Sequence, residues 1–171
     1  MTLPKNNRGF TLIEALVYLA LFSILMGGAV VTAYNLFDSA TKVGTRTMLQ
    51  EESDFMMAKI DWVMSGAKAV TAPASGVTGS SLTVAKWDTS LGDPMQVTQS
   101  GTELLLTRGT NASVVLNNTN TAIVSVSFNH IEGSGDGTVP EGVETVLTVS
   151  ANTPTGATVT RTATSTAYLR R

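Results

Sequence analysis

An uncharged run of 23 residues, 15–37, constrains this chain more than any other feature. As an α-helix, a run of this length extends roughly 35 Å, which is enough to cross the ~30 Å hydrocarbon core of a bilayer. The apolar region of a secretory signal peptide is shorter, typically about 7 to 15 residues. The run therefore predicts a membrane-spanning helix. Gly27 and Gly28, near its middle, are the places where the helix is locally weakest.

The composition excludes several kinds of function. The chain has 171 residues, which fits one domain with an appended helix. Only 14% of the residues are charged and the formal net charge is -2, so no basic surface for nucleic acid is indicated and we expect no direct nucleic-acid partner. The chain has no cysteine, which excludes disulfides, thiolate catalysis and cysteine-ligated metal centres. We expect no cofactor.

Beyond residue 38 the hydrophobic pattern becomes that of an amphipathic helix. Apolar side chains recur at helical spacing at Leu49, Met56, Ile60, Val63 and Ala67. No proline lies between Pro4 and Pro73, so we predict one helix over residues 10–65, about 80 Å long, with Gly66 near its C-cap. Phe55 and Trp62, which are seven residues apart, can lie on one side of the helix as core or partner contacts, and we expect the core.

The remainder of the chain has the pattern of β-strands. Short alternating or β-branched runs are separated by turn residues, and Ser100-Gly101 indicates a tight hairpin. The predicted strands are 81–87, 95–99, 103–107, 113–116, 122–130, 143–151 and 157–169. Short connections favour an antiparallel sheet, and the amphipathic part of the helix is the expected cover for its apolar face. The predicted fold class is therefore α+β.

Candidate catalytic and metal-binding residues are few. His130 is the one histidine, and no nucleophile or acid motif accompanies it, so we interpret it as a structural or surface residue and predict no catalytic site. Glu132, Asp136 and Glu141 are weak candidates for Ca²⁺ because carboxylate oxygens are ligands that this ion prefers. Their irregular spacing matches no EF-hand, and we predict no other metal site.

The N-terminal residues resemble the cleavage and methylation motif of type IV pilins and pseudopilins. Lys5 and Arg8 form a short basic leader, Gly9 follows, and "FTLIEA" opens the apolar helix at Phe10. The resemblance implies that a prepilin peptidase cuts after Gly9 and methylates the new amino group of Phe10. Removing the leader takes away two of the eleven cations, leaving nine against thirteen anions and a net charge of -4.

Glu14 acquires a function through this resemblance. A carboxylate near a helix N-terminus is favoured by the helix dipole, but inside a membrane or a packed bundle it needs a cation. In the family that cation is the amine of a neighbouring subunit's first residue, and the pair sets the axial register of the filament. The alternative interpretation is that the helix is a simple membrane anchor and that the Glu14 side chain extends to the polar boundary of the membrane.

The resemblance also implies a domain organisation, partners and a location. It predicts a cleaved leader (1–9), a transmembrane and filament-core helix (10–37), an amphipathic helix (38–66) and an extracytoplasmic β-rich domain (67–171). Expected partners are other pilin or pseudopilin subunits, the prepilin peptidase, the inner-membrane assembly platform and the membrane itself. The precursor is expected to cross the bacterial inner membrane once, with its N-terminus in the cytoplasm, before it enters an extracytoplasmic filament.

Departures from the family pattern narrow the subtype. The cysteine pair of many major pilins and the frequent mid-helix proline are absent, which favours a minor pilin or a pseudopilin of a secretion or DNA-uptake apparatus. Glu14 distinguishes the chain from the tip pseudopilin that lacks this acid. Two other hypotheses stay open: a tethered extracytoplasmic binding domain that forms no filament, and a tethered hydrolase built around His130.

Overall fold

The fold comes from a computed structural model, which describes residues 11–134 and 139–169. It divides into two compact units, residues 1–40 and 41–171. The helix α1 (Leu12–Met64) contributes residues to both units. This helix confirms the single long helix expected from the sequence, within the described residues.

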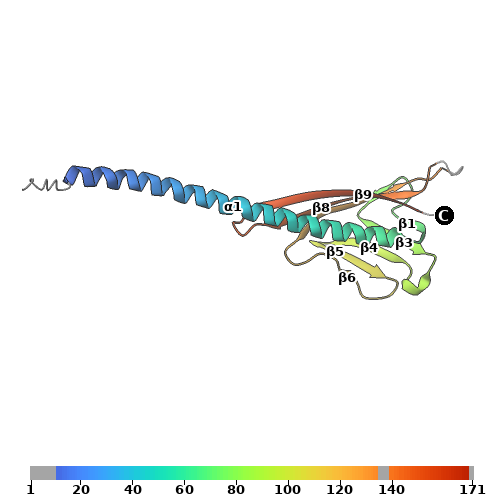
Figure 1. The fold of residues 1–171 in the computed structure, drawn as a ribbon. Coiled ribbons are helices and arrows are strands. Elements are labelled where there is room, and N and C mark those ends of the chain that lie inside the picture. The colour runs from blue at the N-terminus through green and yellow to red at the C-terminus, as the bar shows by residue number, and fades with distance from the viewer. Residues whose placement is uncertain (1–10, 135–138, 170–171) are drawn as a thin grey trace, which may run out of the picture. The chain divides into compact units, whose positions relative to one another are not determined.

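Helix α1 ends where the sequence predicts. Its last helical residue is Met64, and Gly66 has a φ of +68°, the left-handed conformation that glycine adopts most readily after a helix. The chain then enters the first strand directly at Ala67. The absence of a long connection places the strands of the second unit next to the last turns of α1, as Figure 1 shows.

The strands form two antiparallel sheets, whereas the sequence led us to expect one. The five-stranded sheet has the order β1-β3-β4-β5-β6, and the four-stranded sheet has the order β2-β7-β8-β9. The first contains β1 (Ala67–Ala72), β3 (Ser81–Lys86), β4 (Met95–Ser100), β5 (Glu103–Arg108) and β6 (Val114–Val115). The second contains β2 (Thr78–Gly79), β7 (Ala122–Ile131), β8 (Gly142–Asn152) and β9 (Thr158–Tyr168). A short 3-10 helix, η1 (Thr89–Leu91), connects β3 to β4.

Strands β1 and β2 are the two that the sequence pattern did not predict. The first is rich in alanine and carries two register shifts against β3, so it lacks the regular alternation of a strand. The second has only two residues and is held by pairing with Asn129 and Phe128 of β7. Both strands depend on partners distant in sequence, which a local pattern does not contain.

The predicted hairpin is present between β4 and β5. Ser100 pairs with Glu103, leaving Gly101 and Thr102 as the two-residue loop. Gly101 has a φ of +59°, and a glycine with positive φ at the first loop position is typical of the II′ turn, which fits the twist of antiparallel strands.

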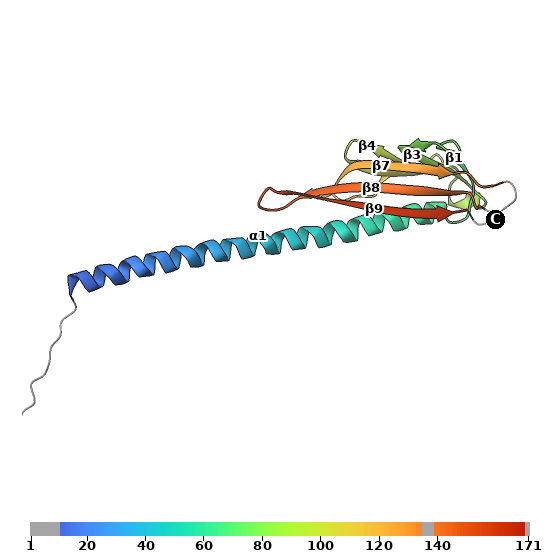
Figure 2. The same ribbon diagram turned by 90° about the horizontal axis from the view of Figure 1, so that it is seen from above.

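The second unit has one hydrophobic core, which α1 and both sheets share. Figure 1 shows β8 and β9 on one side of the C-terminal part of α1 and β4, β5 and β6 on the other. In Figure 2, β7, β8 and β9 lie side by side and this part of α1 runs along β9. The predicted helical face is buried at Leu49, Met56, Ile60 and Val63, whereas Ala67 is buried but lies in β1 and not in the helix. It packs against strand residues such as Leu82, Val97, Phe128 and Leu147.

The prediction that Phe55 and Trp62 are core residues is wrong. Phe55 is 47% exposed and Trp62 is 38% exposed. Each helical residue is rotated by about 100° from the one before, so Phe55 lies beside the buried stripe that contains Met56. The two aromatic rings therefore lie at the margin of the core, on the side of β6.

Candidate functional site

The N-terminus of α1 is capped by Thr11. The Thr11 Oγ1 accepts a hydrogen bond from the Glu14 backbone N–H at 3.3 Å, and the Thr11 carbonyl accepts one from the Ala15 N–H at 3.2 Å. A threonine followed three residues later by glutamate has the spacing of a capping box, in which side chains satisfy free N–H groups at a helix start. Our sequence reasoning missed Thr11, although the letters "TLIE" carried this signal.

The Glu14 side chain is half-buried and lies one turn before Tyr18. The Tyr18 hydroxyl donates a hydrogen bond to Glu14 Oε1 at 3.2 Å. A carboxylate offers two oxygens and about four acceptor positions, so this contact uses only part of its capacity. Glu14 thus has a neutral donor within its own chain, and its charge is not compensated by that contact.

The stretch of α1 that follows Glu14 is apolar and uncovered. Within it Ile24 and Phe37 are each more than 70% exposed. This part of the helix is long and apolar enough to cross a membrane, and none of its most apolar window is buried by the rest of the protein. So large an apolar surface requires lipid or another apolar partner, because exposed apolar patches of this extent are rare on soluble monomers.

The residues that the sequence assigns to processing precede this helix. Lys5, Arg8, Gly9 and Phe10 lie outside the described residues. In a comparison with known protein families, the prokaryotic N-terminal methylation motif matches residues 4–30, which include these four residues.

The N-terminal segment of the chain is similar to this motif, which supports the type IV pilin and pseudopilin family. The match spans the leader residues from Pro4, the Gly9-Phe10 bond, Glu14 and the first part of α1, and it does not include the β-rich unit. Searches of curated proteins and of solved structures gave no match. The motif and the apolar helix support a membrane-anchored precursor, and the motif implies interaction with a processing peptidase and with other pilin subunits.

His130 has a defined place in the second unit. It is buried in β7, with Nδ1 2.9 Å from the Pro73 carbonyl oxygen and Nε2 3.0 Å from Glu141 Oε1. Both ring nitrogens therefore face oxygen atoms, and the side chain ties the β1–β2 connection to the residue before β8.

The calcium candidates are not brought together as a described cluster. Asp136 lies outside the described residues, Glu132 is exposed, and Glu141 contacts His130. Within residues 11–134 and 139–169, no group of three His, Cys, Asp or Glu side chains is placed to hold a metal ion. Glu141 Oε1, a candidate Ca²⁺ ligand, instead contacts His130 Nε2.

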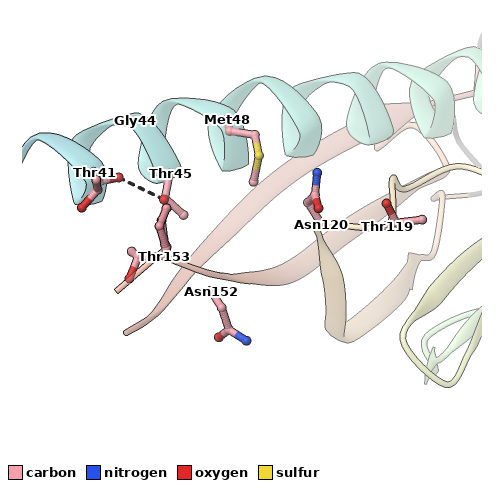
Figure 3. A pocket seen from close by; sticks show the side chains of 9 residues that line it. Thr41, Gly44, Thr45, Met48, Thr119, Asn120, Asn152 and Thr153 are labelled. Atoms are coloured by element: carbon pink, nitrogen blue, oxygen red, sulfur yellow. Dashed lines mark hydrogen bonds between the residues drawn. The ribbon is translucent and has the colours of Figure 1, made fainter. Parts of the chain in front are cut away.

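A surface pocket of about 630 Å³ opens between α1 and the loops that follow β6 and β8 (Figure 3). In Figure 3 the Met48 side chain points toward it, and the Thr45 hydroxyl donates a 3.0 Å hydrogen bond to the Thr41 carbonyl. The other lining residues include Thr119, Asn120 and Asn152. Hydroxyls, amides and one thioether form its wall, so the pocket offers hydrogen bonding without a titratable group.

Lys86 fixes the C-terminus of α1 to the five-stranded sheet. Its side chain is only 6% exposed, and Nζ donates hydrogen bonds to the carbonyl oxygens of Ser65 and, at 3.4 Å, Trp62. The same ammonium lies 5.7 Å from the centre of the Trp62 ring. A cation at this position satisfies helix-end carbonyls and interacts favourably with the helix dipole. Burial lowers the pKa of Lys86 because it disfavours the charged form.

We expect Lys86→Met to lower the free energy of unfolding by about 2–3 kcal/mol, because it leaves buried helix-end carbonyls without a donor. Lys68→Met is the matched control, since Lys68 is exposed and lies over Trp87. The unfolded chain binds the Lys86 proton more tightly than the folded chain. The free energy of unfolding of the wild type therefore rises as pH increases from the lowered pKa toward about 10.4, and the loss of stability in Lys86→Met relative to the wild type should grow over this range. Chemical denaturation of both variants over this range is the measurement, and equal losses in both would contradict the capping role.

Proposed function

We propose that this chain is a minor pilin or a pseudopilin, a structural subunit without a catalytic site. A prepilin peptidase removes the leader 1–9 after Gly9 and methylates the Phe10 amine, with Lys5 and Arg8 on the cytoplasmic side of the inner membrane. The mature subunit then passes through an assembly platform into a type IV pilus or into the pseudopilus of a secretion or DNA-uptake apparatus. The methylation motif at residues 4–30 is the observation that carries this proposal.

The exposed apolar surface of α1 supports assembly through this helix. The precursor can place residues 10–37 in the bilayer, where lipid covers the side chains that the rest of the protein leaves exposed. In a filament, equivalent helices of neighbouring subunits would replace the lipid. Residues 38–66 would then connect this stretch to the extracytoplasmic β-rich domain, residues 67–171.

The state of Glu14 supports its proposed role in setting the register. Glu14 lies in an otherwise apolar stretch of sequence, and its described partner is a neutral hydroxyl at an exposed contact. Charged groups in an apolar environment are unfavourable unless a countercharge is present. The Phe10 amine of a neighbouring subunit would supply that charge, and it exists only after cleavage.

Processing is the direct test of this proposal. In cells with an active prepilin peptidase, the purified chain should have lost residues 1–9 and carry one methyl group on the amine of Phe10, as measured by intact mass and N-terminal sequencing. Gly9→Val should keep the full leader because the cleavage motif is gone. Retention of Met1 in the wild-type chain would instead favour a tethered binding domain that forms no filament.

A further inference from the structure

An apolar groove lies at the edge of the five-stranded sheet. It has a volume of about 340 Å³. We call it the β6 groove and define it by Phe55, Lys59 and Trp62 of α1 and by Arg108, Val114 and Val115 of β5 and β6. Val114 is 53% exposed and Val115 is 43% exposed, and the two aromatic rings opposite them are also partly exposed. A contiguous exposed apolar patch of this kind marks an interaction site.

The backbone at this edge is also open to a partner. Strand β6 has only two residues and pairs with β5 on one side. Natural edge strands are protected by charges, prolines, bulges or their own shortness, and β6 has only the last of these because its two residues are both valines. The groove therefore combines apolar side chains with a short edge that carries no charge or proline within β6.

The charge of the groove selects the chemistry of its occupant. Among the described residues that line it, Lys59 and Arg108 are cationic and none is acidic. Lys59 Nζ lies 5.3 Å from the centre of the Phe55 ring, so one cation sits directly over the apolar wall. A complementary occupant presents large apolar side chains with a carboxylate between them.

The same chain exposes such a segment between β3 and β4. Trp87 is 68% exposed and Leu91 is 47% exposed, and Asp88 lies beside Trp87 on the surface. The Ser90 backbone N–H donates a 2.9 Å hydrogen bond to Asp88 Oδ1, and hydrogen bonding by Ser90 lowers the pKa of Asp88, which keeps this carboxylate ionised. We call residues 87–91 the β3–β4 projection. Lys68 covers one face of the Trp87 ring, at 5.3 Å from its centre.

We propose that the β6 groove binds the β3–β4 projection of a second copy of this chain, with Trp87 and Leu91 against the valines and aromatic rings and Asp88 beside Lys59 or Arg108. This contact deepens the subunit assembly proposed above and rests on it. Within one described chain Asp88 forms no ion pair with either cation, so the complementary charges are available to a neighbour.

Such a contact is weak in isolation and effective in an assembly. Two anchoring side chains and one ion pair cover much less than the roughly 800 Å² that each partner buries in a standard stable interface. When the helices already hold two copies close together, the effective concentration of one copy near the other is high, which favours this second contact. The contact therefore belongs to the full chain in membranes or filaments.

The lack of cysteine allows a specific test. Full-length Leu91→Cys with one tag and full-length Val114→Cys with a second tag are co-expressed, and the membranes are mildly oxidised. We expect a disulfide-linked product that carries both tags. The yield should be roughly tenfold above that of Leu91→Cys with Thr162→Cys, because a disulfide requires Cβ atoms within about 4.5 Å and Thr162 lies on the exposed face of β9. Arg108→Glu in the Val114→Cys copy should lower the yield, and Asp88→Lys in the Leu91→Cys copy should restore it.

Two outcomes would overturn the proposal. One is equal cross-linking of the Thr162→Cys control, and the other is cross-linking of Val114→Cys to a different protein in place of the second copy. Intact mass of the same samples separates this inference from the proposed function. A retained leader contradicts the pilin processing itself, whereas a processed chain without the specific product contradicts only the contact between the β6 groove and the β3–β4 projection.

Discussion

Glu14→Gln should lower the incorporation of this subunit into filaments by about a hundredfold or more, while cleavage after Gly9 continues. The substitution keeps the size of the side chain and its ability to accept a hydrogen bond from Tyr18, but it removes the charge that a neighbour's amine requires. Breaking a buried ion pair costs about 3–5 kcal/mol, and each ~1.4 kcal/mol corresponds to a tenfold change in an equilibrium constant. Quantitative immunoblotting of sheared filaments against membrane fractions measures the effect.

Two neighbouring variants separate the charge of Glu14 from its local contacts. Tyr18→Phe removes the donor to Glu14 Oε1, and Thr11→Ala removes the side-chain cap of α1. Loss of an N-cap costs about 1 kcal/mol, so both variants should assemble within roughly tenfold of the wild type. Assembly of Glu14→Gln at the wild-type level, or equal defects in all three variants, would count against the register mechanism.

Phe128→Ala should lower the free energy of unfolding of the β-rich unit by about 3–5 kcal/mol. Phe128 is fully buried in β7, where it pairs with Gly79 of β2 and Thr145 of β8 and joins the core shared by α1 and both sheets. Its truncation removes apolar contacts and leaves a cavity that surrounding strands fill only in part. Thermal and chemical unfolding of the full chain in detergent, followed by circular dichroism, gives the difference.

Val124→Ala is the matched control for this prediction. Val124 lies on the same strand but is 53% exposed, so its truncation should change the stability by about 0.5 kcal/mol or less. Similar losses for Val124→Ala and Phe128→Ala would show that β7 is not anchored through the shared core. Since domains are stable by only about 5–15 kcal/mol, the expected loss for Phe128→Ala is a large fraction of the total.

The periodicities in the sequence were sufficient to predict the main elements. The spacing of Leu49, Met56, Ile60 and Val63 predicted the buried face of α1, and long alternating runs predicted β7, β8 and β9. The division into two sheets was missed because hydrophobic alternation identifies a strand's faces but not its neighbours. The exposure of Phe55 and Trp62 was missed for a similar reason: residues that flank a buried stripe differ from it by one helical step, and tertiary packing decides on which side the core ends.

The candidate site was predictable to the extent that it depends on local residue order. Gly9, Phe10 and Glu14 were assigned from the residue order of the motif that the chain resembles, and the match over residues 4–30 includes these three positions without testing their roles. The Thr11 cap is equally local, so the sequence contained it. The bonds from Lys86 to Trp62 and Ser65 span 24 and 21 residues, and the contact between His130 and Pro73 spans 57 residues, so neither could be inferred before the strands were paired.

The attachment of the C-terminal end of α1 to the sheet has a mechanical consequence. Tension applied along the helix leaves it through the short connection at Ser65 and Gly66 and enters β1 at once. The hydrogen bonds of Lys86 join the same helix end to β3, so two neighbouring antiparallel strands share the pull. A pull on this helix end is therefore divided between two paired strands, and it does not shear the ladder between them because Ala67 and Lys86 are opposite one another and are drawn the same way.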